Sequence, residues 1–444
     1  MMDPRELFQI VAAEARSHGV HDVEVTIGEN QEALTRFANN SIHQNVAERN
    51  TGISIRPQEN QRTARAETNR MDADSVRAAV RNAIALMRSQ EPDDRLLPLA
   101  EPEPLTKLER VAQSTVTCTP SQRAAAVAEA IGIAESEGQT AAGIYSTAFS
   151  RETLLNSRGV FAEYEQSMAE FSVTMLEDGS SGWAKASAVD RSSLDVAGLA
   201  RQASQKAARS RNPQELEPGP YTVILEPAAV LDLVGQMFGD FGATALEDQR
   251  SFLNDRVGTK LFGANVTILD DCTHPLQSGP SFDGEAVARR PLTLVERGVV
   301  RDLAYCRGAA QRAGKQATGH GLPIPNEVGE FPLNIVFAGG AASLDEMIRS
   351  TPRGILVTRL WYIREVDPYE KMMTGMTRDG TFLIERGEVA GGIRNFRFNQ
   401  GLIELLNHVE LIGPAVRASG EETFDMIMPA LKAHEFHFTE VTRF

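Results

Sequence analysis

Two long runs of alternating apolar and polar residues, each lying between helical segments, most constrain the fold of this chain. The first run covers residues 22–57 and begins with Val23, Val25 and Ile27 alternating with polar residues, and the second covers residues 139–189. Alternation with a period of two is typical of strands that bury one face. The sequence therefore predicts two helix–meander–helix blocks in series, which form either two lobes or one layered α+β domain.

Capping residues and apolar periodicity predict the four helices that flank these runs. They cover residues 3–18 with Asp3 as N-cap, 73–88, 120–137 with Ser121 as N-cap, and 193–209. Turn residues divide the alternating runs into hairpins. The predicted turns lie at residues 28–30, 39–40 and 50–52 in the first run, and at 156–159 and 178–182 in the second.

A third region begins at Pro218-Gly219-Pro220 and mixes short strands with helices. Its predicted strands cover residues 223–225, 333–337, 355–360 and 381–388, and its predicted helices begin at Pro227, after Ser343 and at Leu402. The fold class is therefore α+β, with N-terminal helix and antiparallel-meander layers followed by a mixed, β-rich C-terminal domain. A proline-rich segment at residues 91–118 separates the two blocks. The expected domains are 1–110, 111–217 and 218–444.

Charge and composition narrow the class of protein. The net charge is −15, and the densest basic run, residues 201–211, lies on a predicted helix, so we expect no nucleic-acid partner. No stretch approaches 18 apolar residues, which predicts no membrane segment. The N-terminus lacks a signal-peptide pattern. Three widely spaced cysteines fit a reducing compartment, so a cytoplasmic location is expected.

Three places were considered as metal sites, which need clustered His, Cys, Asp or Glu residues. His434 and His437 flank Glu435, but they lie three apart in a segment that alternates like a strand, which favours a terminal strand. Asp270, Asp271, Cys272 and His274 are metal-capable residues close together, yet they also suit the end of a strand and a turn. The helix after Pro227 is amphipathic and carries neither histidine nor cysteine.

Two glycine-marked segments are candidates for binding a peptide. Gly339-Gly340 follows a predicted strand and leads into a helix, whose first N–H groups suit a carboxylate or carbonyl group. Thr374, Gly375 and Arg378 lie in a polar segment that ends at Gly380 and is predicted to be a loop or a hairpin turn. The chain has no GxSxG elbow, P-loop or GxGxxG pattern, so the residues alone identify no active site.

An ordered set of stretches resembles the TldD/PmbA family of peptidase-related proteins. The set begins with the turn Asn156-Ser157-Arg158-Gly159 and the segment LEPGPYTVILEPAA at residues 216–229. It continues through residues 281–321, and its most specific part is residues 374–413. In the metallopeptidase members, a zinc-binding HExxxH motif follows a strand and a proline turn like the one at Pro227. A cysteine near the C-terminus, beyond the equivalent of Ile412-Gly413-Pro414, supplies the third ligand.

This resemblance implies that the zinc site is degenerate here. Counted on from Pro227, the three motif positions hold Gly235, Gln236 and Asp240, and no cysteine follows Cys306. Glycine offers no ligand, and glutamine is no general base at neutral pH. The chain thus resembles the PmbA/TldE side of the family. We expect no metal and no catalytic residue in this chain.

The resemblance also implies partners. It predicts pairing with a TldD-type zinc-bearing paralogue, the two together admitting unstructured peptides that the zinc subunit cleaves. Family members are linked to peptide-antibiotic maturation, antitoxin degradation and, by old naming, DNA gyrase modulation, for which the acidic charge gives no support. Two alternatives stay open. One is a homodimeric binding or scaffold protein without a proteolytic role, and the other is an independent hydrolase built around Asp270, Cys272 and His274.

Overall fold

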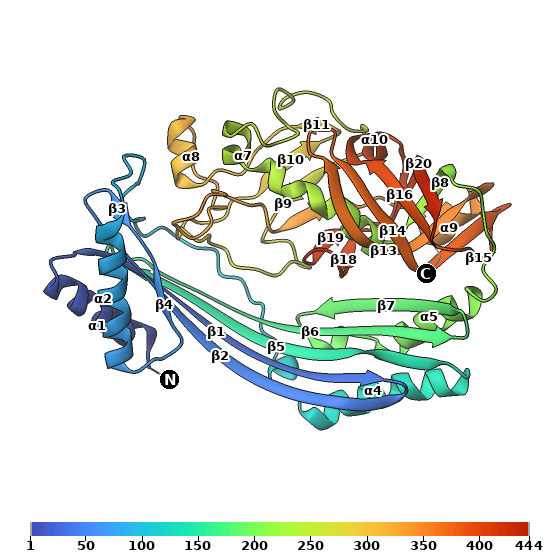
Figure 1. Cartoon of the computed structure of the whole chain (residues 1–444), viewed down its shortest axis with the longest axis horizontal. Helices are drawn as coiled ribbons and strands as arrows, with labels where there is room; N and C mark the ends of the chain where they lie inside the picture. The colour runs from blue at the N-terminus through green and yellow to red at the C-terminus, as the bar shows by residue number, and fades with distance from the viewer. Residues whose placement is uncertain (1, 443–444) are drawn as a thin grey trace.

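The computed structural model describes residues 2–442, and a long curved antiparallel sheet forms its N-terminal half (Figure 1). The strand order is β3-β2-β1-β5-β6-β7, with β4 paired to β2. Because β1 pairs with β5 along 14 residues, the two predicted blocks share this one sheet. The strands are β1 (Asp22–Ala38), β2 (Ser41–Glu59), β3 (Arg62–Thr63), β4 (Ala66–Thr68), β5 (Thr140–Asn156), β6 (Phe161–Glu177) and β7 (Ser180–Ala188).

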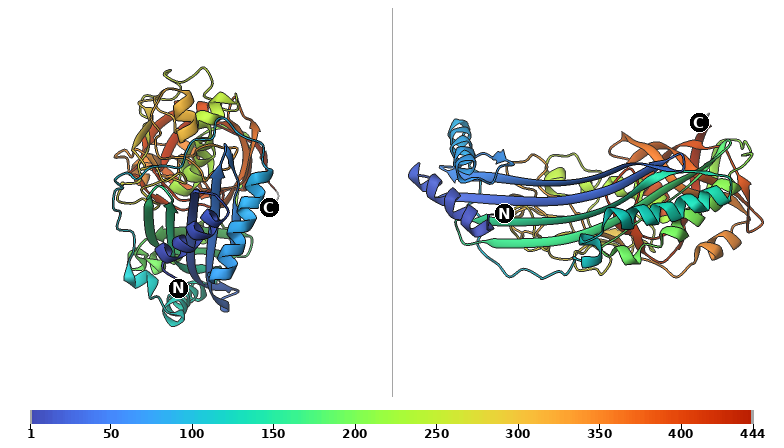
Figure 2. Two further views of the ribbon diagram at one scale, coloured as in Figure 1. Left: turned by 90° about the vertical axis from the view of Figure 1, so that its left-hand side faces the viewer. Right: turned by 90° about the horizontal axis from the view of Figure 1, so that it is seen from below.

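Helices cover one face of this sheet at its two ends (Figures 1 and 2). At one end α1 (Pro4–Ser17) and α2 (Ala73–Ser89) pack on the β1 residues Val23, Val25 and Ile27. At the other end α4 (Pro120–Ser136) and α5 (Val196–Arg209) pack around Phe37 and Phe171. All four predicted helices are present. Between these helices lie the short α3 (Gln113–Val116) and η1 (Arg191–Ser193).

The predicted helix starts need two corrections. The N-cap of α4 is Thr119, not Ser121, and Thr119 forms a capping box with Gln122. The last helix of this half begins at Val196, with Asp195 as N-cap, rather than at residue 193. In both cases two neighbouring residues have side chains that can cap a helix. The helix starts after the residue whose side chain accepts a hydrogen bond from the N–H group three positions further on.

Two of the five predicted turns are wrong. The turn residues at 28–30 and 50–52 lie inside β1 and β2, where Gly28 pairs with Gly52 and Asn30 with Asn50. The segment therefore makes one long hairpin at Asn39-Asn40, both of which have positive φ. The turns after Asn156 and at residues 178–179 are confirmed. Cross-strand pairing on both sides of β1 outweighs the local turn preference of these residues.

The C-terminal region contains two further sheets that share one large core with α6 (Pro227–Val234) and η2 (Gly235–Phe241). The first has the order β11-β10-β9-β12-β19-β18. In the second, β13 pairs with both β8 and β14, so the path β13-β8-β20-β16-β14 closes into a ring, with β15 and β17 attached to it. The strands are β8 (Gly219–Leu225), β9 (Ile268–Asp270), β10 (Leu292–Glu296), β11 (Val299–Val300), β12 (Ile335–Phe337), β13 (Arg353–Asp367), β14 (Met372–Glu385), β15 (Glu388–Gly392), β16 (Phe396–Gly401), β17 (Val409–Ile412), β18 (Val416–Ala418), β19 (Met426–Met428) and β20 (Leu431–Val441).

Short helices connect these strands, and one predicted loop is corrected. The helices are α7 (Ala243–Glu247), α8 (Arg307–Arg312), α9 (Leu344–Arg349) and α10 (Leu402–Asn407), the last two as predicted. Residues 374–380, expected to form a loop or turn, lie within β14. Their turn signal is a β-bulge, because Asp379 and Gly380 have positive φ where the pairing with β13 shifts register.

The C-terminal region lies over the face of the long sheet that the helices leave free (Figure 1). On that face Tyr164 accepts a hydrogen bond from the Gly279 N–H group, and Lys185 donates to the Gly420 carbonyl. Arg417 reaches from β18 to Ser187 on β7. None of the described helices has the length and apolar character needed to cross a membrane.

Candidate functional site

The helix at the strand-to-helix junction after β8 carries the three motif positions in a buried place. Pro227 opens α6, which continues as the 3₁₀ segment η2 from Gly235. Gly235 lies against the 420–425 loop, where a Cβ atom at this position would be 2.7 Å from Thr423 Cγ2. A side chain at position 235 therefore has no room without movement of that loop, and the glycine serves close packing.

Gln236 and Asp232 fasten the same loop to the helix. The Gln236 amide donates to the carbonyls of Asp232 and Glu422, at 3.1 and 3.4 Å. The Asp232 carboxylate accepts from the backbone N–H groups of Glu421 and Glu422. Burial raises the pKa of Asp232 to about 6, against the opposing effect of these hydrogen bonds. The 420–425 loop is thus attached to α6 and η2 by hydrogen bonds of these two side chains.

Asp240 is bound by a cation of the chain itself. The Lys371 ammonium, in the turn between β13 and β14, donates to both Asp240 and Glu365, and all three groups lie close together. Asp240 and Lys371 are buried, and Glu365 is about one-third exposed. Burial raises the pKa of Asp240, and Lys371 opposes that effect. The carboxylate at the third motif position is therefore neutralised by an ion pair.

The donor set of this site does not fit zinc. A zinc ion needs about four donors, usually imidazole, thiolate or carboxylate groups. Here the first position has no side chain, the second donates hydrogen bonds, and the third pairs with Lys371. By the resemblance, the segment beyond Ile412-Gly413-Pro414 carries the third ligand, a cysteine, in the metallopeptidase members. In this chain the segment lies against the motif positions, where it presents Thr423 and the Glu422 carbonyl. Across residues 2–442, no group of three or more His, Cys, Asp or Glu residues is arranged to hold a metal ion.

The other metal-capable residues do not come together either. His434 contacts Thr222 and Glu410, whereas His437 lies 3.8 Å from Glu404. Both are on β20, which bulges at Glu435, as the positive φ there shows. The segment is a terminal strand, as its alternation predicts.

The residues Asp270, Cys272 and His274 are engaged separately. Asp270 is buried at the end of β9, where it accepts a hydrogen bond from the Asn334 N–H group and lies 3.0 Å from His320 Nε2. His274 Nδ1 accepts from the Leu276 N–H group within its own turn. Burial raises the pKa of the Cys272 thiol, which disfavours a thiolate nucleophile.

The proposed peptide-binding residues are also placed by the fold. Cβ atoms at Gly339 and Gly340 would lie 2.4 Å from Ala415 N and 2.3 Å from the Ile412 carbonyl oxygen, so both glycines permit close packing of the 412–415 segment. Gly375 lies against the ring of Phe398. Thr374 donates to the Phe398 carbonyl, and Arg378 stacks on Trp361, at 4.8 Å, with its side chain nearly half exposed. Gly339 and Gly340 thus pack against the 412–415 segment, whereas Thr374, Gly375 and Arg378 contact residues of β16 and β13.

Comparison with known proteins gives the family. Three domain models of the PmbA/TldA metallopeptidases match in order: domain 1 at residues 23–86, the central domain at 107–211 and the C-terminal domain at 218–440. The chain belongs to the PmbA/TldD family. The order and extent of these matches agree with the resemblance found in the sequence.

Solved structures share the fold over nearly the whole length. TldE from Thermococcus kodakarensis superposes with a TM-score of 0.88 at 21% identity, covering 98% of this chain and 100% of that one. A Thermotoga maritima protein described as a modulator of a DNA gyrase gives a TM-score of 0.87 at 18% identity, with the same coverage. At these identities the likeness shows the fold alone.

Curated relatives match part of the chain. An uncharacterised protein of Methanocaldococcus jannaschii is 29% identical over 204 residues, which are 44% of this chain and 46% of that protein. A metalloprotease of Methanothermobacter thermautotrophicus is 25% identical over 233 residues, 50% of this chain and 49% of that protein. The match thus spans about half the length of these relatives.

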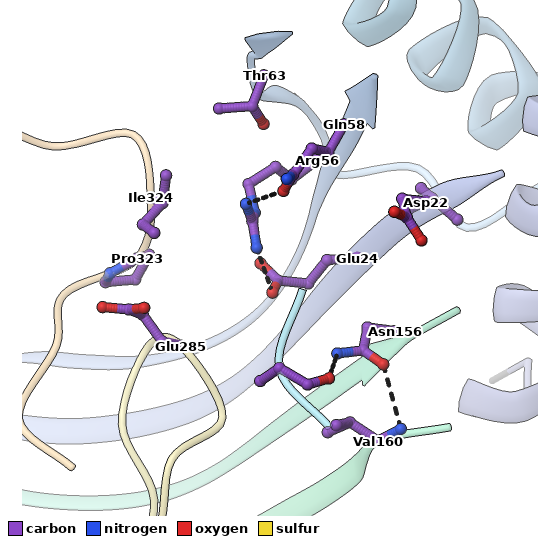
Figure 3. Close-up of polar contacts among 12 residues, drawn as sticks. Asp22, Glu24, Arg56, Gln58, Thr63, Asn156, Val160, Glu285, Pro323 and Ile324 are labelled. Atoms are coloured by element: carbon purple, nitrogen blue, oxygen red, sulfur yellow. Dashed lines mark hydrogen bonds and ion pairs between the residues drawn. The ribbon is translucent and has the colours of Figure 1, made fainter. Parts of the chain in front are cut away.

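Sequence reasoning missed two buried charged residues of this PmbA/TldD chain. Lys371 lies in a plain hairpin turn, and no local pattern predicts that it pairs with Asp240, 131 residues away. Glu285 lies two residues after Asp283 in the run SFDGEA and is buried at the junction between the long sheet and the C-terminal region (Figure 3). A buried acidic residue in a glycine-containing turn has no signal that separates it from an exposed one.

Proposed function

We propose that this chain is the non-catalytic, PmbA/TldE-like subunit of a two-subunit metallopeptidase that degrades or processes unstructured peptides. In this proposal a TldD-type paralogue supplies zinc and hydrolysis, and this chain supplies wall, entrance and peptide-binding surface. The observation that carries the proposal is the packing of the motif positions, where Gly235 is covered by Thr423 and Asp240 is paired with Lys371. If a chain with such a site takes part in metal-dependent peptide cleavage, another subunit has to supply the metal ion.

Exposed apolar side chains support the requirement for a partner. The three most exposed large apolar side chains of residues 2–442 are Val366, Tyr362 and Tyr369, at 60%, 56% and 55%. All three lie on β13 or in the turn after it, the turn that also carries Lys371. Apolar side chains that gather on one exposed element are typical of a protein contact surface. We assign this surface to the contact with the paralogue.

The decisive measurement compares this chain, the paralogue and their mixture. We expect the chain alone to bind no stoichiometric zinc and to leave unfolded casein peptides intact. The mixture should cleave them faster than the paralogue alone. Stoichiometric zinc and cleavage by this chain alone would contradict the proposal and favour an independent hydrolase. A stable homodimer that ignores the paralogue would favour a binding or scaffold role.

A surface variant makes this test sharper. Val366→Glu places a charge on the proposed contact surface, and we expect it to abolish the acceleration in the mixture while the isolated chain keeps its thermal unfolding midpoint. The matched control is Val416→Glu on β18, a valine that is 41% exposed away from the hairpin. If both variants accelerate the paralogue as the unchanged chain does, the contact surface is misassigned.

A further inference from the structure

A cavity of about 350 Å³ lies at the junction between the N-terminal half and the C-terminal region. The N-terminal side contributes the loop around Thr63 and the segment after α2, and the C-terminal side contributes the loop at residues 324–329 and the start of α8. This volume lies in the range of small-ligand pockets, which often form between domains. Neither the degenerate motif nor the exposed hairpin lines it.

The lining combines apolar walls with an excess of acid. Leu96, Leu97, Ile324 and Pro325 supply apolar surface. Four carboxylates line the cavity, Glu91, Asp93, Glu285 and Glu327, against two guanidinium groups, Arg95 and Arg312. Arg312 is already bound to Glu247 by two hydrogen bonds. The cavity therefore favours a ligand with a positive charge on an apolar stem.

Glu285 is the one buried carboxylate of this lining, because Glu91, Asp93 and Glu327 are exposed. It is 3% exposed, and Figure 3 shows it on its loop next to Pro323. Its Oε1 atom accepts a hydrogen bond from the Arg307 N–H group. Its Oε2 atom has no hydrogen-bond partner among the described residues and lies 3.9 Å from the Arg307 guanidinium.

A buried carboxylate with a free oxygen costs stability unless a ligand completes its interactions. Burial and the neighbouring Asp283 raise the pKa of Glu285 to about 7, and Arg307 and Arg56 oppose this only in part. Cys306, which also lines the cavity, stays a neutral thiol because burial raises its pKa to about 12. The carboxylate is therefore undercompensated in the free protein, as in sites where strain serves binding.

We propose that this cavity binds an aliphatic cation, a primary ammonium or guanidinium group on a short apolar stem, with Glu285 as its counter-ion. The apolar walls contact the stem, and the Glu285 Oε2 atom accepts a hydrogen bond from the charged group. A lysine or arginine side chain of a peptide and a free alkylamine share this chemistry. This proposal does not depend on the zinc-bearing partner, and it can be tested with this chain alone.

Calorimetric titration of the full chain tests this proposal with four probes. Acetyl-lysine amide carries a positive charge on a peptide unit, and pentylamine carries it on an alkyl chain alone. Acetyl-norleucine amide lacks the charge, and glutarate has a negative charge instead. We expect one or both cations to bind, and the neutral and anionic probes to bind at least tenfold more weakly. Binding of acetyl-lysine amide alone identifies a peptide side chain as the source, and binding of pentylamine alone identifies a free amine. Equal binding of acetyl-norleucine amide, or no binding of either cation at 10 mM, would overturn the proposal.

Variants and pH assign the binding to Glu285. Glu285→Gln should weaken cation binding at least tenfold, whereas Glu296→Gln, which changes an exposed carboxylate at the end of β10 that does not line the cavity, should not. If Glu285→Gln fails to fold, Thr63→Arg serves instead, because its tethered guanidinium should exclude the probe. Affinity of the unchanged chain should rise about tenfold from pH 6 to pH 8, since the ionised fraction of Glu285 rises through its pKa of about 7. If both Glu285→Gln and Thr63→Arg bind the cation as tightly as the unchanged chain does, the assignment is overturned.

Discussion

Lys371 places its ammonium group between the carboxylates of Asp240 and Glu365, and so determines what the third motif position does. Its side chain is 6% exposed, so both partners of the pair are largely removed from water. A buried ion pair adds little net stability, but removal of one partner leaves an uncompensated charge. At the residue scale, the site is therefore a structural ion pair in the place where a metal ligand is expected.

Lys371→Met tests this ion pair. We expect a loss of about 3–5 kcal/mol in the free energy of unfolding at pH 7.5, because Asp240 stays buried without a cation. Burial already raises the pKa of Asp240, and the variant raises it further, so the carboxyl group takes up a proton more readily as the pH falls and the loss is smaller at pH 5 than at pH 7.5. Urea unfolding at both pH values measures the effect. The control is Lys260→Met, an exposed lysine, and an equal loss in both variants would contradict the role of the pair.

The N-terminal half is built from elements that are longer than local sequence signals indicate. β1 and β2 run through Gly28, Asn30, Asn50 and Gly52 without a turn, because these residues face one another across the ladder. Helices then cover only the two ends of the sheet. The helix starts were thus predicted to within three residues, although competing cap residues shifted two of them, and the strand boundaries were predicted poorly where residues with turn preference are held by pairing on both sides.

The corrected start of α4 gives a prediction at the scale of one element. Thr119→Ala should cost about 1 kcal/mol, because the Thr119 hydroxyl accepts from the Gln122 N–H group in the capping box. Ser121→Ala, at the position first expected to be the cap, is exposed and should change stability by less than about 0.5 kcal/mol. Thermal unfolding of both variants checks the order. The reverse order would mean that the helix begins at Ser121.

The whole molecule depends on a polar joint between the long sheet and the C-terminal region (Figure 3). Glu24 on β1 is fully buried and accepts two hydrogen bonds from Arg56 and one from Arg65. Arg65 in turn donates to the Ile324 carbonyl, across the joint. Burial raises the pKa of Glu24, but the two guanidinium groups outweigh it and hold the pKa below its usual value. This carboxylate links the two halves next to the acidic cavity.

Glu24→Gln tests the joint. The amide has one acceptor oxygen for two guanidinium groups, so we expect a loss of about 3–5 kcal/mol and faster amide hydrogen exchange at residues 320–326. The loss should diminish below about pH 4, because the pKa of Glu24 is depressed and its stabilisation disappears as the carboxylate protonates. Glu32→Gln, exposed on the same strand and the same face, is the control. If amide hydrogen exchange at residues 320–326 increases equally in both variants, Glu24 does not connect the two halves.

Elements with strong local chemistry could be predicted from the residues alone. The capped helices, the alternating strands and the turns after Asn156 and at Asn39-Asn40 follow from periodicity and turn preference. The ordered family stretches also followed from the sequence, and the resemblance that they carry predicts Gly235, Gln236 and Asp240 at the family's zinc-motif positions. These features depend on residues that are close in the chain, and so they can be predicted from the sequence.

Contacts between residues that are distant in the chain could be identified only in the folded protein. The pairing of β1 with β5 into one sheet, Thr423 against Gly235, Lys371 at Asp240 and Glu285 at the cavity all join residues more than 20 positions apart, or surfaces of separate regions. Whether a charged residue is buried depends on the packing of distant elements, and burial sets both its pKa and its energetic cost. The sequence therefore predicts that the family's zinc ligands are missing, whereas the contacts of Gly235, Gln236 and Asp240 depend on the fold.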